Sequence, residues 1–314
     1  MKDYIALAAK GYHEWWRYVV GAFAIFIIWQ AGSIPFLGAV VYKLSTDGKD
    51  ISSLGSYETL MGTLDSNLTF FLMMLSFLVG FVGILLIIKF FHNQKLKDLL
   101  TTRPKFDWKR VLVGFSIVGF FILAMTIIDY KLNTDDYILN FKSKEFFILA
   151  IIAIVLVPFQ TSFEELYFRG YIMQGLGIIF KNRWLPLFAT SIGFGLLHIG
   201  NPEVEKLGYL IMISYIGTGF LLGIMALMDE GLELSIGYHA GNNLITALLV
   251  TADWTAFQTE SIFIYTEDPS IGFDVLIPVL IIYPIYVLIL AKVYDWSNWK
   301  EKLVGKVNLP EVET

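Results

Sequence analysis

The chain contains no cysteine, and this absence removes several kinds of chemistry at once. Without a thiol there is no disulfide, no thiolate-bound zinc, no cysteine nucleophile and no S-palmitoylation. Charged residues are also scarce: they make up 16% of the 314 residues, against about 25% in ordinary soluble domains. The 23 basic and 28 acidic residues give a net charge of −5, which argues against a nucleic-acid-binding protein.

Hydrophobic residues are abundant instead, at 56% of the chain with a mean hydropathy of +0.64, which excludes a disordered protein. Eight stretches without charge are each about as long as the ~17–25 residues that a membrane-spanning helix needs. Lipid offers the backbone no hydrogen-bond partner, so these stretches are predicted to be helices. They are residues 18–42, 68–88, 111–128, 146–163, 184–202, 207–228, 234–252 and 275–291.

The fold class predicted from this pattern is all-α: a polytopic membrane helix bundle of about eight transmembrane helices. Gly32 and Pro35 are expected to bend or end the first span, and Pro278 and Pro284 to kink the last. One integral membrane domain is expected over residues 1–299, with its polar motifs in a core at 146–252. Residues 300–314 are expected to form a short, mobile cytoplasmic tail.

The orientation follows from the distribution of Lys and Arg. With the N-terminus inside, the cytoplasmic segments hold 17 of these residues and the opposite loops hold 6. Positive charge favours the cytoplasmic side, so both termini are predicted to be cytoplasmic. The acidic loop 253–274 then lies outside; its acidic residues are Asp253, Glu260, Glu267, Asp268 and Asp274.

Two segments at the cytoplasmic side are expected to lie against the membrane surface. The first 16 residues have apolar residues at helical spacing and end in Trp15 and Trp16, which predicts an interfacial helix with a tryptophan belt. The basic segment 92–110 contains Pro104 and is predicted to be a loop facing anionic headgroups.

Ionisable residues inside apolar spans are expensive and indicate function by default. The first group continues the fourth span and includes Glu164, Glu165 and Arg169. Glu165 and Arg169 are four residues apart, on one helix face, so they are predicted to pair. Glu164 points elsewhere, so the two carboxyl groups are expected to differ in pKa. The alternative is that the span ends at Phe163 and these charges lie among headgroups.

Two further groups stand on separate spans. His198 follows Phe194 near the end of the fifth span, where a lone histidine is usually an interfacial one. His239 and Asn243 share one face of the seventh span, and Gly237 and Gly241 lie close to them in the sequence. The alternative to a functional role is that these two side chains form polar contacts between helices. His13 and His92 are expected to be ordinary structural histidines.

Taken together, the three groups supply a general base, a second titratable group and hydrogen-bond donors for an oxyanion. No covalent nucleophile stands out, because neither Ser162 nor Ser191 is arranged as in a serine–histidine dyad. Activated water is therefore the expected nucleophile. The chemistry predicted is hydrolysis of an amide bond within or beside the membrane.

These groups resemble the signature of the CPBP family, which contains type II CaaX prenyl proteases and bacteriocin-processing (Abi) membrane proteins. The family pattern is Glu-Glu-x-x-x-Arg, Phe-x-x-x-His and His-x-x-x-Asn, and all three parts occur here in order between residues 158 and 246. The resemblance implies an intramembrane glutamic endopeptidase that acts on a membrane-associated peptide or protein without a cofactor. It also implies a place in the plasma membrane of a prokaryote.

The resemblance assigns roles as well. Glu164 would activate water with His198, His239 and Asn243 would form the oxyanion hole, and Glu165 with Arg169 would be the supporting pair. The chain lacks His-Glu-x-x-His, but a zinc site of Glu164, His198 and His239 is chemically possible. The sequence is also compatible with a non-catalytic partner or bacteriocin-immunity protein. It fits a transporter less well, because the paired broken helices of transporters are not evident.

Overall fold

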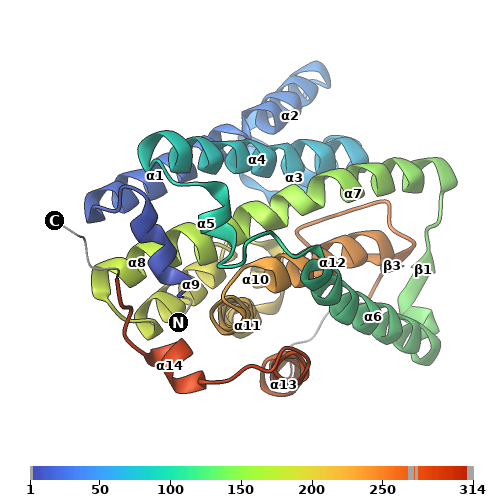
Figure 1. Ribbon diagram of the computed structural model, residues 1–314. Helices are drawn as coiled ribbons and strands as arrows, with labels where there is room; N and C mark the ends of the chain where they lie inside the picture. Colours follow the sequence, from blue (N-terminus) through green and yellow to red (C-terminus); the bar gives the residue numbers. More distant parts are fainter. Residues whose placement is uncertain (1–2, 268–271, 273–274, 310–314) are drawn as a thin grey trace.

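A computed structural model describes residues 3–267, 272 and 275–309, and its helices form one bundle (Figure 1). The predicted all-α membrane bundle is confirmed. The longer helices are α1 (Trp15–Ala31), α2 (Ile34–Thr46), α4 (Ser66–Leu86), α6 (Trp108–Leu132), α7 (Ser143–Glu165), α8 (Met173–Phe180), α9 (Trp184–Leu196), α11 (Met212–Asp229), α12 (Glu233–Leu249) and α13 (Tyr283–Val293). The shorter ones are α3 (Tyr57–Gly62), α5 (Leu96–Leu100), α10 (Pro202–Leu207) and α14 (Trp299–Val304).

A helix lies at each of the eight predicted positions. Among the described residues, five helical runs are long and apolar enough to cross a membrane. They are Trp15–Thr46, Ser66–Phe91, Trp108–Leu132, Ser143–Phe180 and Tyr209–Asp229. The remaining three helices are shorter than predicted and end at Leu196, Leu249 and Val293. The chain is thus an integral membrane protein, and the crossing of these shorter helices stays a prediction.

Glycine and proline residues lie where the first and last helical runs are interrupted. Gly32 separates α1 from α2, and Pro35 lies in the first turn of α2, where its missing N–H leaves no helix bond unmade. The last run begins with a π-helical turn, Pro278–Ile282, just before Pro284. A π-helical turn is one of the ways in which a helix accommodates such an interruption.

The N-terminal segment is not the interfacial helix predicted. Residues Ile5–Lys10 form a 3₁₀-helix whose side chains Ile5 and Ala8 are buried within the protein. The Tyr4 hydroxyl donates to the carbonyl of Leu99, at 2.6 Å, and so joins this segment to α5. An amphipathic pattern shows that one face of the helix avoids water, but either lipid or protein can cover that face. Here the apolar face packs against the rest of the protein. Trp15 and Trp16 begin α1 and are exposed.

The segment 92–110 is also more structured than the predicted loop. It contains α5, and His92 at its start is buried, with one ring nitrogen 2.7 Å from the Tyr12 carbonyl and the other 2.7 Å from the Tyr171 hydroxyl. Both nitrogens of His92 therefore have structural partners.

The predicted mobile tail is corrected over its described part. Residues Trp299–Val304 form α14, and the chain then bonds to the turn between α8 and α9 through Val307 N–H to Lys181 and Arg183 N–H to Gly305. Residues 310–314 lie outside the described residues, as do Asp268 and Asp274 of the acidic loop.

A small sheet, which the sequence analysis did not predict, joins two of the connecting loops. Its strands are β1 (Tyr137–Leu139), β2 (Val250–Thr251) and β3 (Phe263–Tyr265), in the order β1-β3-β2. β1 and β3 are antiparallel, with Ile138 opposite Ile264, whereas β2 and β3 are parallel.

Helix α12 is held deep in the bundle by close contact with α6. A side chain at Gly237 would collide with the carbonyl of Val111, and one at Gly241 would lie 2.6 Å from the carbonyl of Phe115. Glycine lets two membrane helices approach this closely.

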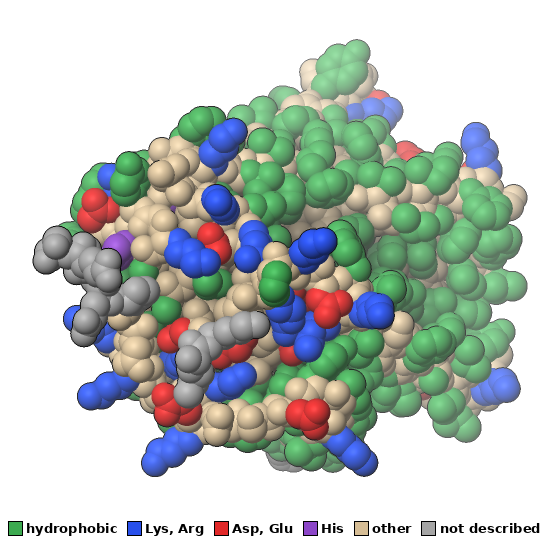
Figure 2. All heavy atoms as spheres, viewed as in Figure 1, with side chains coloured by type: hydrophobic (Ala, Val, Ile, Leu, Met, Phe, Trp, Pro, Cys, Tyr) green, Lys and Arg blue, Asp and Glu red, His purple; other side chains and the backbone are tan. Residues whose placement is uncertain are grey.

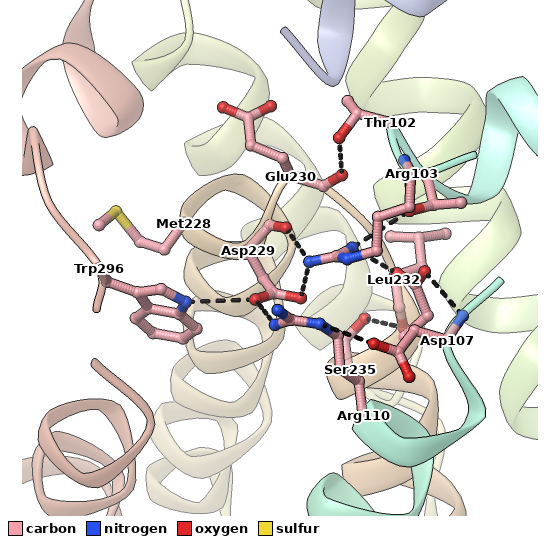
Figure 3. A network of polar contacts seen from close by, with 12 residues as sticks. Thr102, Arg103, Asp107, Arg110, Met228, Asp229, Glu230, Leu232, Ser235 and Trp296 are labelled. Atoms are coloured by element: carbon pink, nitrogen blue, oxygen red, sulfur yellow. Dashed lines mark hydrogen bonds and ion pairs between the residues drawn. The ribbon is translucent and has the colours of Figure 1, made fainter. Parts of the chain in front are cut away.

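An ion cluster holds the start of α12 (Figure 3). Arg103 donates to Asp229 at 2.7 Å and to Glu233 at 3.0 Å, while Arg110 and the indole N–H of Trp296 also bond Asp229. The cluster therefore joins the segment after α5, the α11–α12 turn and the C-terminal region. In Figure 2, charged side chains gather on the side of α5 and α14, and hydrophobic ones cover the side of α4, α6 and α7.

Candidate active site

The first polar motif lies where α7 passes into α8. The helix does not end at Phe163: a π-helical turn, Leu166–Ile172, continues it to Phe180, in a run of 38 residues. Arg169 and Glu165 pair at 2.9 Å, and both side chains have no exposed surface. The predicted pair is present, and the alternative that these charges lie among headgroups is wrong.

Arg169 is held by the protein on further sides. Its Nη2 donates to the carbonyl of Gly219 in α11 at 3.1 Å, and its guanidinium lies over the Phe194 ring, 4.4 Å from the centroid. These contacts place the pair between α7, α9 and α11. Burying two opposite charges together avoids the large cost of burying either alone.

His239 of α12 lies between the two carboxylates. Its Nδ1 is 3.0 Å from Oε1 of Glu165, and its Nε2 is 3.3 Å from Oε2 of Glu164. A neutral imidazole has a proton for only one of these contacts, whereas an imidazolium has a proton for both. Glu164 is the partly accessible carboxylate, with 12% of its side chain exposed.

His198 lies just beyond α9, with its ring orientation fixed. Its Nδ1 is 2.8 Å from the Phe194 carbonyl, and the ring stacks on Tyr215 with centroids 4.5 Å apart. Because a carbonyl can only accept, Nδ1 carries a proton, and in the neutral ring Nε2 is then the basic nitrogen.

Asn243 is oriented by a residue that the sequence analysis missed. Its Nδ2 donates to Oε1 of Gln160, at 2.9 Å, and Gln160 is buried. Gln160 precedes Glu164 by four residues, which places both on one face of α7. A polar side chain at that spacing in an apolar span was the available signal.

These side chains share one cavity of about 410 Å³. Glu164, His198, His239 and Asn243 line it, whereas Glu165 and Arg169 lie behind its wall. Its apolar walls include Trp29, Phe77, Phe168, Phe194 and Tyr238. Glu203 of α10 also lines the cavity and was not among the predicted site residues. The arrangement offers a carboxylate, a basic nitrogen and an amide donor in a largely apolar space.

The donors of the possible zinc site, Glu164, His198 and His239, have suitable chemistry and line the same cavity. Over the part of the chain that the structure describes, however, no group of three or more such side chains converges as metal ligands would. Both nitrogens of His239 face carboxylates in this arrangement.

The fold and the site define an integral membrane protein with an acid–base cavity between its helices. Residues 143–245 match the family described as type II CAAX prenyl endopeptidase Rce1-like, and they include all six predicted site residues. Over this segment the chain is similar to the CPBP family of type II CAAX prenyl endopeptidases, as its motifs indicated. This similarity points to a peptidase.

A second comparison covers more of the chain. The uncharacterized protein YyaK of Bacillus subtilis (strain 168) is 29% identical over 246 residues, which cover 77% of this chain and 80% of that protein. No solved structure matches the chain significantly.

Proposed function

We propose that the protein is an intramembrane endopeptidase that hydrolyses a peptide bond of a membrane-associated substrate with water activated by Glu164 and His198. The observation that carries the proposal is the shared cavity: a carboxylate, a basic ring nitrogen and an amide line one space within apolar helices. The family match to peptidases supports it.

In this mechanism Glu164 takes a proton from water while the water oxygen attacks the peptide carbonyl. His198 orients the water or shares its proton through Nε2. The negative oxygen of the tetrahedral intermediate is stabilised by Asn243, whose second amide hydrogen is not used by Gln160. His239 stabilises the same oxygen through its Nε2–H, which turns from Glu164 to the oxyanion once Glu164 has taken the proton from water. The proton then passes to the leaving nitrogen as the carbon–nitrogen bond breaks. Glu165 and Arg169 position His239 from behind.

The test is cleavage of membrane-anchored peptides by the purified protein in lipid vesicles, read by mass spectrometry. New peptide ends that depend on the protein are expected. If the folded wild-type protein cleaves no membrane-anchored peptide, and Glu164→Gln restores a deletion phenotype, the protein is instead a non-catalytic partner or immunity protein.

A metal analysis tests zinc chemistry at the same residues. We expect chelator titration to leave cleavage unchanged and purified protein to carry no stoichiometric zinc, because Glu164 itself is the base. One equivalent of zinc, with activity lost on chelation and restored by zinc, would overturn the metal-free mechanism while keeping the same site.

A further inference from the structure

Glu203 lies on the cavity wall with one carboxylate oxygen fixed and the other unsatisfied. Oε1 accepts the backbone N–H of Ala256 at 2.7 Å, which anchors the side chain. Oε2 is buried and makes no hydrogen bond. A buried acceptor without a partner is costly, and such atoms in a cavity wall are candidates for binding a ligand.

Two tyrosines share the cavity wall with this carboxylate. Tyr57 and Tyr215 both line the cavity, and the charge of Glu203 acts on both hydroxyl groups, with Tyr215 within hydrogen-bonding reach of the carboxylate. Tyr57 is held by its hydroxyl, which donates to the Ala256 carbonyl at 2.6 Å. A carboxylate in a cavity wall that also contains aromatic rings suits a cation, which can bond the oxygen and contact a ring.

The charge of the cavity favours the same class of ligand. Among the described residues that line it, Glu164 and Glu203 are the ionisable acids and there is no Lys or Arg. Arg169 is fully buried and paired with Glu165, so it offers no cation to a ligand. Burial raises the pKa of Glu203 from its ordinary value, and a bound cation would offset that desolvation.

We propose that Glu203 is a specificity-determining residue that binds a Lys or Arg side chain of the substrate near the cleaved bond. The substrate class is then an apolar membrane segment carrying a basic residue. A substrate that presents a free terminal carboxylate to this part of the cavity would meet Glu203 and be disfavoured. This inference rests on the proposed function, but the preference of Glu203 for a basic side chain is measured as a binding affinity, without catalysis.

The experiment measures binding to the full-length Glu164→Gln protein in detergent micelles, by fluorescence anisotropy. The probes are three labelled apolar peptides of one sequence that carry Lys, Gln or Glu at a single central position. We expect the Lys peptide to bind about tenfold or more tightly than the Gln peptide, since a hydrogen bond to a charged partner contributes this much. Adding Glu203→Gln should make the affinities for the Lys and Gln peptides equal. Adding Glu203→Asp, which keeps the negative charge, should leave the Lys peptide the tighter binder.

Glu205→Gln is the matched control, because Glu205 is exposed on the same short helix. It should leave the preference unchanged, and melting curves should show that all variants are folded. Equal affinity for the Lys and Gln peptides, or a preference that survives Glu203→Gln, would overturn the inference. A Lys preference that depends on Glu203, in a wild-type protein that cleaves nothing, would refute the proposed function and leave this inference standing.

Discussion

At the scale of single residues, the fully buried pair of Glu165 and Arg169 explains why charges are tolerated inside an apolar helix. Each charge stabilises the other, and Arg169 also bonds the Gly219 carbonyl while Glu165 receives His239. The pair therefore has two roles, in folding and in positioning the histidine that faces Glu164.

We predict that Glu165→Gln or Arg169→Ala lowers the stability of the protein as well as its activity. Either change leaves a buried charge without its partner, which costs about 3–5 kcal/mol. Thermal melting in detergent measures the effect. Asp47→Asn is the control, because Lys43 and Asp47 form a more exposed pair at the same spacing. Breaking that pair should lower the free energy of unfolding by about 0.5 kcal/mol or less. Equal melting temperatures for all these variants would contradict a buried, paired Arg169.

Asn243 should matter for the rate rather than for folding. If it donates to the oxyanion, Asn243→Ala should lower kcat by about 10²–10³-fold, the usual effect of removing one such donor. The partner Gln160 fixes its orientation, so Gln160→Ala should give a smaller loss in the same direction. Steady-state kinetics on a membrane-anchored peptide checks both variants. An unchanged kcat in Asn243→Ala would remove this residue from the oxyanion hole.

The residues of the candidate site could be singled out from the sequence because ionisable and strongly polar side chains rarely occur in apolar spans. Gln160 and Glu203 were missed for different physical reasons. Gln160 carries no charge, so it did not stand out among the apolar residues of its span. Glu203 lies in a connecting segment, where a carboxylate is ordinary, and only the tertiary fold brings it to the cavity beside Ala256.

At the scale of helices, the start of α12 depends on ion pairs that come from distant parts of the chain. Arg103 contacts Asp229 (Figure 3) and also Glu233, and the side chains of both acids are almost completely buried. Since α12 carries His239 and Asn243, the cluster fixes one end of the helix that completes the site. Helix positions were predicted well from hydropathy, but these cross-links and the π-helical turn at Leu166–Ile172 depend on packing that no local pattern encodes.

A double-mutant cycle tests this connection. Arg103→Ala and Glu233→Gln should each lower the melting temperature, and together they should lower it by less than the sum, with a coupling of about 0.5–3 kcal/mol. Lys105→Ala, an exposed position in the same segment, should have no comparable effect. Strictly additive losses would show that the two side chains do not stabilise each other.

At the scale of the whole molecule, the apolar surface and the helical runs establish membrane insertion, whereas the orientation rests on charge. We predict that reporters fused at the C-terminal end or within 92–109 report cytoplasm, and that reporters within 255–267 report the outside. The reason is the distribution of Lys and Arg, 17 against 6. An outside location for the C-terminal end would mean that one of the shorter helices does not cross.

The N-terminal segment shows the limit of sequence reasoning at this scale. Its helical spacing of apolar residues predicts an interfacial helix, yet Ile5 and Ala8 pack inside the protein. An amphipathic pattern reveals that one face avoids water, but lipid and protein interior satisfy it equally. Helix α12, predicted as a span, is a largely buried helix of 17 residues, and its crossing of the membrane stays a prediction.

The central claim is that Glu164 is the base of a membrane-embedded peptidase, and one rate comparison tests it most directly. Three proteins are reconstituted in vesicles with one cleavable membrane peptide: wild type, Glu164→Gln and Glu145→Gln. Glu145 is the control, because it lies on the same helix as Glu164 but does not line the cavity. Gln keeps the shape of Glu without its basicity, so Glu164→Gln should cleave about 10²–10⁴-fold more slowly at an unchanged melting temperature, and Glu145→Gln should match wild type. Cleavage by folded Glu164→Gln at the wild-type rate would contradict the account.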